Sequence, residues 1–93
     1  MQQRIAKRVT DRARQVLAPL GQWPRCSRWV PVSRIAAKLA AELPGDLRDY
    51  EVDHVLPLAG FDLRDDEQVA KAFSVENHQW LSRGANRRKG ARR

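Results

Sequence analysis

The sequence predicts a small α+β fold in which two N-terminal helices precede a strand, strand, helix (ββα) unit. Apolar residues recur at helical spacing in the first half, strand-forming residues dominate after residue 49, and a basic helical segment follows. With 93 residues, 42% of them hydrophobic, the chain has material for one modest core. We therefore expect a single domain over 1–93, with a helical part at 1–48 and the ββα unit at 49–93.

The first predicted helix runs from Arg4 to Leu17. Its apolar residues recur every three or four positions and its basic residues lie largely elsewhere on the helical wheel, which is the pattern of an amphipathic helix. The apolar positions are Ile5, Val9, Ala13, Val16 and Leu17. Pro19 and Gly21 predict the end of this helix.

An irregular segment at 23–31 separates the two helices, because its prolines restrict the backbone. Ser33 is the expected N-cap of the second helix, and the Pro-Gly pair at 44–45 predicts its end. The apolar face of this helix consists of Ile35, Leu39 and Leu43. Two aromatic residues of the irregular segment are expected to cover the core: Trp23 and Trp29.

The second half predicts two strands and two further helices. Aromatic and β-branched residues at 50–58 favour a strand, which Pro57 confines to a sheet edge, and 79–81 favour a second strand. Between them, an Asp-x-x-Gln capping arrangement opens a short helix at 65–73. A last helix is predicted from Gly84 onward.

The net charge of +7 favours a polyanionic partner, since Lys and Arg displace the counterions of a nucleic-acid backbone. The charges are segregated: 49–76 is rich in Asp and Glu, whereas the run from 83 to 93 has no acid. That basic run consists of Arg83, Arg87, Arg88, Lys89, Arg92 and Arg93. An acidic pocket beside a basic segment suits a site that holds both a cation and a phosphate; the alternative is a solvated face with a disordered tail.

The single cysteine, Cys26, excludes an internal disulfide and a zinc knuckle of paired Cys-x-x-Cys motifs. We expect Cys26 to be buried and neutral. The sequence also has no apolar run long enough for a membrane span and no signal-peptide pattern, so a cytoplasmic protein is expected.

Adjacent Asp53 and His54 supply groups that metal-assisted phosphodiester hydrolysis requires. The imidazole of His54 can accept a proton near neutral pH, and the carboxylate of Asp53 suits a hard cation. Neighbours on a regular strand point to opposite faces, so both can serve one site only if the strand ends or bulges there.

Three segments follow in the order and spacing of the HNH endonuclease family, which this chain resembles from about residue 50 to residue 90. They are Asp53-His54-Val55-Leu56-Pro57-Leu58, Asn77-His78-Gln79-Trp80-Leu81 and Asn86-Arg87-Arg88-Lys89-Gly90. The resemblance is to small phage and prophage members, and it implies a ββα-metal core that binds its cation between hairpin and helix. The implied partners are DNA and proteins of phage packaging or recombination.

The resemblance also implies the roles of individual residues. His54 would be the general base, Asp53 a metal ligand, and Asn77 the residue that pins the loop orienting His54. Asn86 would replace the family's final histidine as the second protein ligand, which makes this an H-N-N variant that favours Mg²⁺ or Mn²⁺. The basic residues at 83–93 would contact DNA phosphates.

Several alternatives stay open at this point. His78 stands where an apolar residue is usual, and a register shift of one residue would turn His78 rather than Asn77 toward the site. Asn86 could be a helix N-cap. The chain could also be a basic DNA-binding module without activity, or a nuclease-toxin domain that attacks DNA or RNA.

Overall fold

The computed structural model describes the backbone of residues 1–91 and the side chains of residues 1–88, and within this part it is a small α+β domain. Its helices are α1 (Gln2–Leu17), α2 (Val32–Glu42), α3 (Asp66–Ala72) and α4 (Arg83–Ala91). Strands β1 (Tyr50–His54) and β2 (His78–Ser82) form a two-stranded antiparallel sheet. Short 3-10 turns connect them: η1 (Ala18–Leu20), η2 (Ser27–Trp29), η3 (Leu47–Asp49), η4 (Leu58–Gly60) and η5 (Val75–Asn77).

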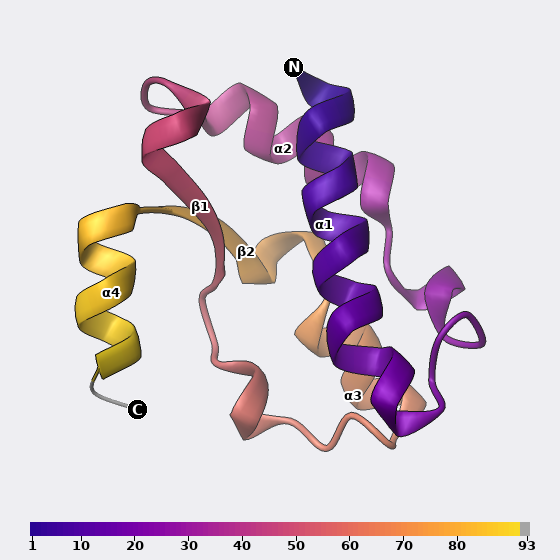
Figure 1. The fold of residues 1–93 in the computed structure, drawn as a ribbon. Helices are drawn as coiled ribbons and strands as arrows, with labels where there is room; N and C mark the ends of the chain where they lie inside the picture. The colour runs from indigo at the N-terminus through magenta and orange to yellow at the C-terminus, as the bar shows by residue number, and fades with distance from the viewer. Residues whose placement is uncertain (92–93) are drawn as a thin grey trace.

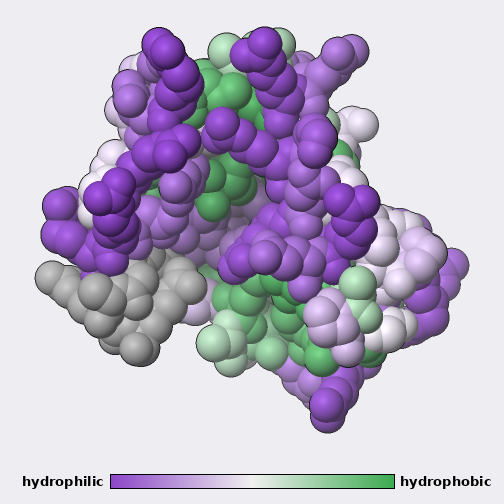
Figure 2. All heavy atoms as spheres, viewed as in Figure 1, coloured by the Kyte–Doolittle hydropathy of each residue, from purple (hydrophilic) through white to green (hydrophobic). Residues whose placement is uncertain are grey.

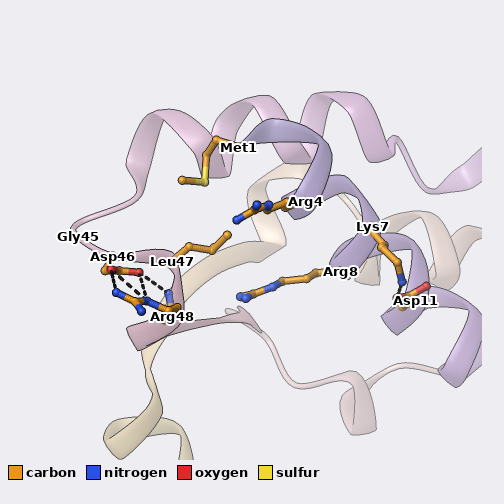
Figure 3. A pocket seen from close by; sticks show the side chains of 9 residues that line it. All are labelled: Met1, Arg4, Lys7, Arg8, Asp11, Gly45, Asp46, Leu47 and Arg48. Carbon is orange, nitrogen blue, oxygen red and sulfur yellow. Dashed lines mark hydrogen bonds and ion pairs between the residues drawn. The ribbon is translucent and has the colours of Figure 1, made fainter.

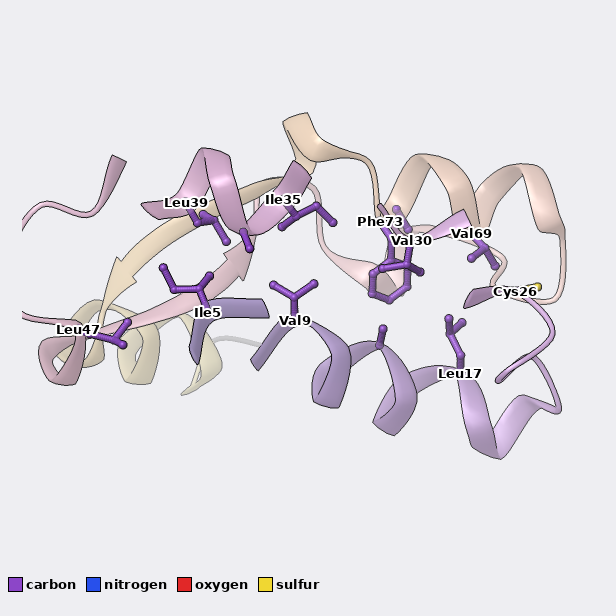
Figure 4. Close-up of a cluster of buried hydrophobic side chains, with 13 residues drawn as sticks. Ile5, Val9, Leu17, Cys26, Val30, Ile35, Leu39, Leu47, Val69 and Phe73 are labelled. Atoms are coloured by element: carbon purple, nitrogen blue, oxygen red, sulfur yellow. The ribbon is translucent and has the colours of Figure 1, made fainter. Parts of the chain in front are cut away.

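The hydrophobic core lies where α1 and α2 meet α3. Four of the five predicted apolar positions on α1 are buried, namely Ile5, Val9, Ala13 and Leu17, and Val16 is partly buried against the core. Figure 4 shows α1 side chains facing those of α2 and α3 across the core. The amphipathic pattern therefore identifies the buried face of α1 correctly.

Gly21 ends the turn after α1 with a φ of +71°, in the left-handed region that glycine adopts without steric cost. The predicted stop of the first helix is confirmed.

Two details of the second helical segment differ from the predictions. α2 begins at Val32 with Pro31 as its N-cap, and Ile35 N donates to Pro31 O at 3.0 Å, so Ser33 lies inside the first turn and caps nothing. Trp29 is 41% exposed, because Val30 beside it closes the core and the η2 turn directs the indole outward. Trp23, by contrast, packs against the core as expected.

Side chains of α2 and β2 join the helical half to the sheet. Trp80 Nε1 donates to Leu39 O at 2.7 Å, and Lys38 Nζ donates to His78 O at 2.6 Å. Figure 1 shows β1 and β2 between the N-terminal helices and α4. The sheet is thus fixed from the α2 side, and α4 covers it from another direction.

No helix within residues 1–91 is both long and apolar enough to cross a membrane.

Candidate functional site

Asp53 and His54 are the last two residues of β1. The strand pairs with β2 so that Asp53 lies opposite Gln79 and His54 opposite His78. Both site residues are buried, with exposed fractions of 6% and 7%. The predicted strand to residue 58 is too long: β1 ends at His54, and Asp53 and His54 are both still paired with residues of β2.

The side chain of Asn77 explains why β1 ends there. Its Oδ1 accepts from Leu56 N at 2.7 Å, and its Nδ2 donates to Leu56 O at 3.2 Å and to Ala72 O at 2.8 Å. We call these three hydrogen bonds the Asn77 clamp. Because the clamp replaces the partners that a strand ladder would give Leu56, it holds the loop directly after His54 against the end of α3.

The imidazole of His54 is enclosed by two aromatic rings. Phe73, which is 1% exposed and ends α3, meets it edge-on with ring centroids 5.5 Å apart. The ring of His78 lies at 4.9 Å and is tilted by 57°. Packing on two sides limits the rotation of the His54 ring, which is the kind of pre-organisation a proton-transfer group requires.

His78 is a buried histidine that the sequence analysis considered as an alternative to Asn77 at the site. Its Nδ1 lies 2.7 Å from Ser74 O, which fixes Nδ1 as the protonated nitrogen because a carbonyl can only accept. Burial lowers the pKa of His78, the Ser74 bond acts in the opposite direction, and Lys38 lowers it further. His78 is therefore a neutral packing partner of His54, while Asn77 holds the loop.

A group of oxygen-bearing side chains lies on the α4 side of the hairpin. Asp53 Oδ2 accepts from Gln79 Nε2 at 3.0 Å, and Asn86 Nδ2 of α4 donates to Glu51 Oε2. Glu51 and Asp53 are two residues apart on β1 and so share one face of the strand. Sequence reasoning missed Glu51, although its i−2 position relative to Asp53 was a signal for it.

The N-cap alternative for Asn86 is wrong. α4 begins at Arg83, and Ser82 Oγ accepts from Ala85 N at 3.2 Å, which is the cap. Asn86 lies within the first turns of the helix, with its amide directed at β1. Its side chain is thus available for a role other than capping.

Three arginines of α4 are exposed: Arg83, Arg87 and Arg88. Arg83 Nε donates to Arg48 O at 2.5 Å and so connects α4 to the η3 turn. The other predicted DNA contacts, Lys89, Arg92 and Arg93, lie outside the described side chains.

Residues 1–88 contain no group of three or more His, Cys, Asp or Glu side chains placed to hold a metal ion. The oxygen donors on the α4 side of the hairpin also include the amides of Gln79 and Asn86. Cys26 is fully buried, and burial followed by its contact with Asp66 raises the pKa of its thiol. This agrees with the expectation of a neutral, structural cysteine.

Comparisons with protein families, with curated protein sequences and with solved structures find no match for this chain.

Proposed function

We propose that this chain is a metal-dependent endonuclease of the HNH type that hydrolyses DNA phosphodiester bonds. The observation that carries the proposal is the Asn77 clamp, because it fixes the loop directly after the adjacent Asp53 and His54. The order β1, β2, α4 supports the proposal, because a ββα-metal core requires two strands followed by a helix; here α3 is inserted between the strands.

His54 acts as the general base in this proposal. Its imidazole is held between Phe73 and His78, and a neutral imidazole can take a proton from water. Neutral His78 adds no positive charge that would disfavour proton uptake by its neighbour.

The residues on the α4 side of the hairpin fit a hard divalent cation. Asp53 offers a carboxylate, and the Asn86 amide nitrogen is committed to Glu51, which leaves the amide oxygen as the ligand atom. Asp53 and Asn86 would hold Mg²⁺ or Mn²⁺, and Glu51 orients the amide. A bound cation supplies charge stabilisation at the phosphate and at the leaving oxygen.

The exposed arginines of α4 bind the DNA backbone. Arg87 and Arg88 lie on the helix that carries Asn86, so phosphates bound by them lie close to the proposed site. Such contacts position the duplex and carry no sequence information, and we therefore expect little sequence preference from α4.

A second candidate function is DNA binding without cleavage, which the same exposure of Arg87 and Arg88 favours. The two candidates differ in their need for a cation. A binding module holds DNA equally well in EDTA and never breaks it, whereas the nuclease loses turnover without its metal.

The test is a supercoiled-plasmid nicking assay in Mg²⁺, in Mn²⁺ and in EDTA. Loss of a general base typically lowers a rate by about 10²- to 10⁴-fold, so we expect His54→Ala to nick at least about 100-fold more slowly while it binds DNA normally. Asp53→Ala should also be inactive. Asp49→Ala, which removes an exposed carboxylate just before β1, is the matched control and should keep wild-type turnover.

Undiminished nicking by His54→Ala would remove His54 from the mechanism. DNA binding without cleavage in any of the metals would favour the binding module instead.

A further inference from the structure

A basic cavity lies between the N-terminal half of α1 and the η3 turn, at the opposite end of β1 from His54. Its volume is about 610 Å³. The charged residues that line it are Arg4, Lys7, Arg8, Asp11, Asp46 and Arg48. Figure 3 shows the side chains of Arg4 and Arg8 extending from α1 toward η3. We call this surface the α1 cradle.

Half of the cradle's positive charge is already neutralised. Lys7 pairs with Asp11 at 2.8 Å, and Arg48 pairs with Asp46 at 2.9 Å. In the part of the chain that the structure describes, Arg4 and Arg8 have no ion-pair partner, although Arg8 Nη1 donates to Tyr50 O at 3.2 Å. The cradle therefore carries two uncompensated guanidinium groups.

The two guanidinium groups stand one helical turn apart. Like charges at positions i and i+4 repel each other and destabilise a helix, so Arg4 and Arg8 oppose the formation of α1 in the free protein. An anion bound between them removes this repulsion. A guanidinium fork suits the oxygens of a phosphate better than those of a chloride ion or water, because it can bind them in a bidentate manner.

The cradle is continuous with the face that carries the proposed site. Arg8 bonds to the first residue of β1, and Arg83 of α4 bonds to Arg48 O. In Figure 1, β1 lies between α1 and α4, and Figure 2, viewed from the same direction, shows hydrophilic side chains over much of this face. One polyanion can therefore cross α4 and α1 together.

The cradle and the proposed site lie near opposite ends of β1. Three strand residues lead from Tyr50 to Asp53, which is about 10 Å at 3.3 Å a residue.

We propose that Arg4 and Arg8 bind phosphates of the DNA backbone beyond those held at the proposed site. This inference rests on DNA being the substrate of the proposed function. It assigns to α1 a direct part in substrate binding in addition to its part in the core.

The test measures binding of a short DNA duplex by fluorescence anisotropy in EDTA over a series of NaCl concentrations. Each lost phosphate contact reduces the slope of log K against log [NaCl] by about 0.9, so Arg4→Gln with Arg8→Gln should flatten the slope by about 1.8. The same two contacts amount to an affinity loss of about 60-fold at 0.1 M NaCl, which vanishes toward 1 M.

Arg34→Gln with Arg64→Gln is the matched control. Both residues are exposed, neither lines the cradle, and the double variant loses the same charge. Its slope should equal that of the wild type. If the control flattened the slope equally, the effect would come from the overall charge of the protein, and the proposal that the cradle binds DNA would be overturned.

Because Arg8 also bonds to Tyr50 O, its replacement can weaken the fold. Arg4→Glu alone avoids this, since Arg4 is exposed, and it should weaken DNA binding while thermal unfolding matches the wild type. Unchanged binding by Arg4→Glu would overturn the inference.

The failure of this inference can be distinguished from that of the proposed function. If the cradle variants keep the wild-type slope while Arg87→Ala with Arg88→Ala flattens it, the cradle lies outside the interface and the nuclease proposal stands. If the wild-type protein binds no DNA, both fail. If cradle variants weaken binding and the plasmid is never nicked, the cradle stands and the nuclease does not.

Discussion

Replacing Asn77 by alanine removes the clamp on the loop that follows His54. The side chain is 5% exposed and makes three hydrogen bonds to main-chain atoms of Leu56 and Ala72. Alanine supplies none of them. The variant therefore tests whether the site depends on this one residue.

The magnitude follows from the hydrogen bonds. A net contribution of about 1 kcal/mol for each bond gives a loss of about 3 kcal/mol in the free energy of unfolding. For a domain of this size, 1 kcal/mol lowers the melting temperature by about 4–8 °C, so the expected decrease is about 12–24 °C. That is a large part of the stability of a typical small domain.

Thermal and urea unfolding followed by circular dichroism measure this loss. Glu76→Ala is the control, because Glu76 is the exposed neighbour of Asn77 on η5 and its replacement should change the free energy of unfolding by less than about 0.5 kcal/mol. If Asn77→Ala and Glu76→Ala were equally mild, the clamp would not stabilise the loop. The main support for the proposed site would then be lost.

Three further predictions concern single side chains. Because the pKa of His78 is lowered in the folded state, the unfolded chain binds the proton first, and the free energy of unfolding should fall as the pH drops below about 6.5. In urea unfolding at pH 5 and pH 7, His78→Phe should show a smaller difference between the two pH values than the wild type, and an equal difference would contradict the prediction. Cys26 is buried and the pKa of its thiol is raised, so it should react with iodoacetamide at pH 8 at least about 100-fold more slowly in the native protein than in urea. Equal rates would refute the burial of Cys26. Glu51→Ala should weaken Mn²⁺ binding, measured by calorimetry, by about 10-fold or more, whereas Glu51→Gln, which keeps an acceptor oxygen for Asn86, should weaken it less. An unaltered Mn²⁺ affinity in Glu51→Ala would exclude a role for Glu51 in orienting Asn86.

The helices were predictable because their buried faces repeat with the helical period. The apolar residues of α1 and α2 lie in the core as the periodicity indicates. The start of α2 was not predictable in the same way. Ser33 is a favoured N-cap type, but burial of Ile35 and Leu39 sets the phase of the helix, and the Pro31 carbonyl already accepts the first helical bond.

The start of α3 shows a similar division. Asp65 caps the helix, as predicted, by accepting from Glu67 N at 3.0 Å. Gln68 does not complete a capping box, because Asp65 N already donates to Asp62 O, and Gln68 Oε1 accepts from Asp62 N instead. The capping motif therefore predicted the Asp65 cap correctly, but it did not predict that the preceding loop folds back so that Gln68 bonds to Asp62.

The site was predictable as a set of residue types and less so as contacts. The adjacency of Asp53 and His54 is read from the chain, and the motif indicated Asn77 as the residue that holds the loop. The packing of His54 against Phe73 and His78 depends on how α3 returns to the sheet, which no local pattern reveals. The bond between Asn86 and Glu51 likewise joins residues 35 positions apart.

The division of the sequence at residue 48 is a division of secondary structure and not of the core. Among the described residues, the buried apolar cluster takes ten members from residues 5–47 and only Val69, Ala72 and Phe73 from the second half. Phe73 belongs both to this cluster and to the surroundings of His54, and the indole of Trp80 bonds to α2. The N-terminal helices therefore supply most of the apolar burial against which the hairpin and the His54 ring are positioned. Because hydrophobic burial is the main favourable term in folding, the geometry of the candidate site depends on the half of the chain that carries none of its proposed catalytic or metal-binding residues.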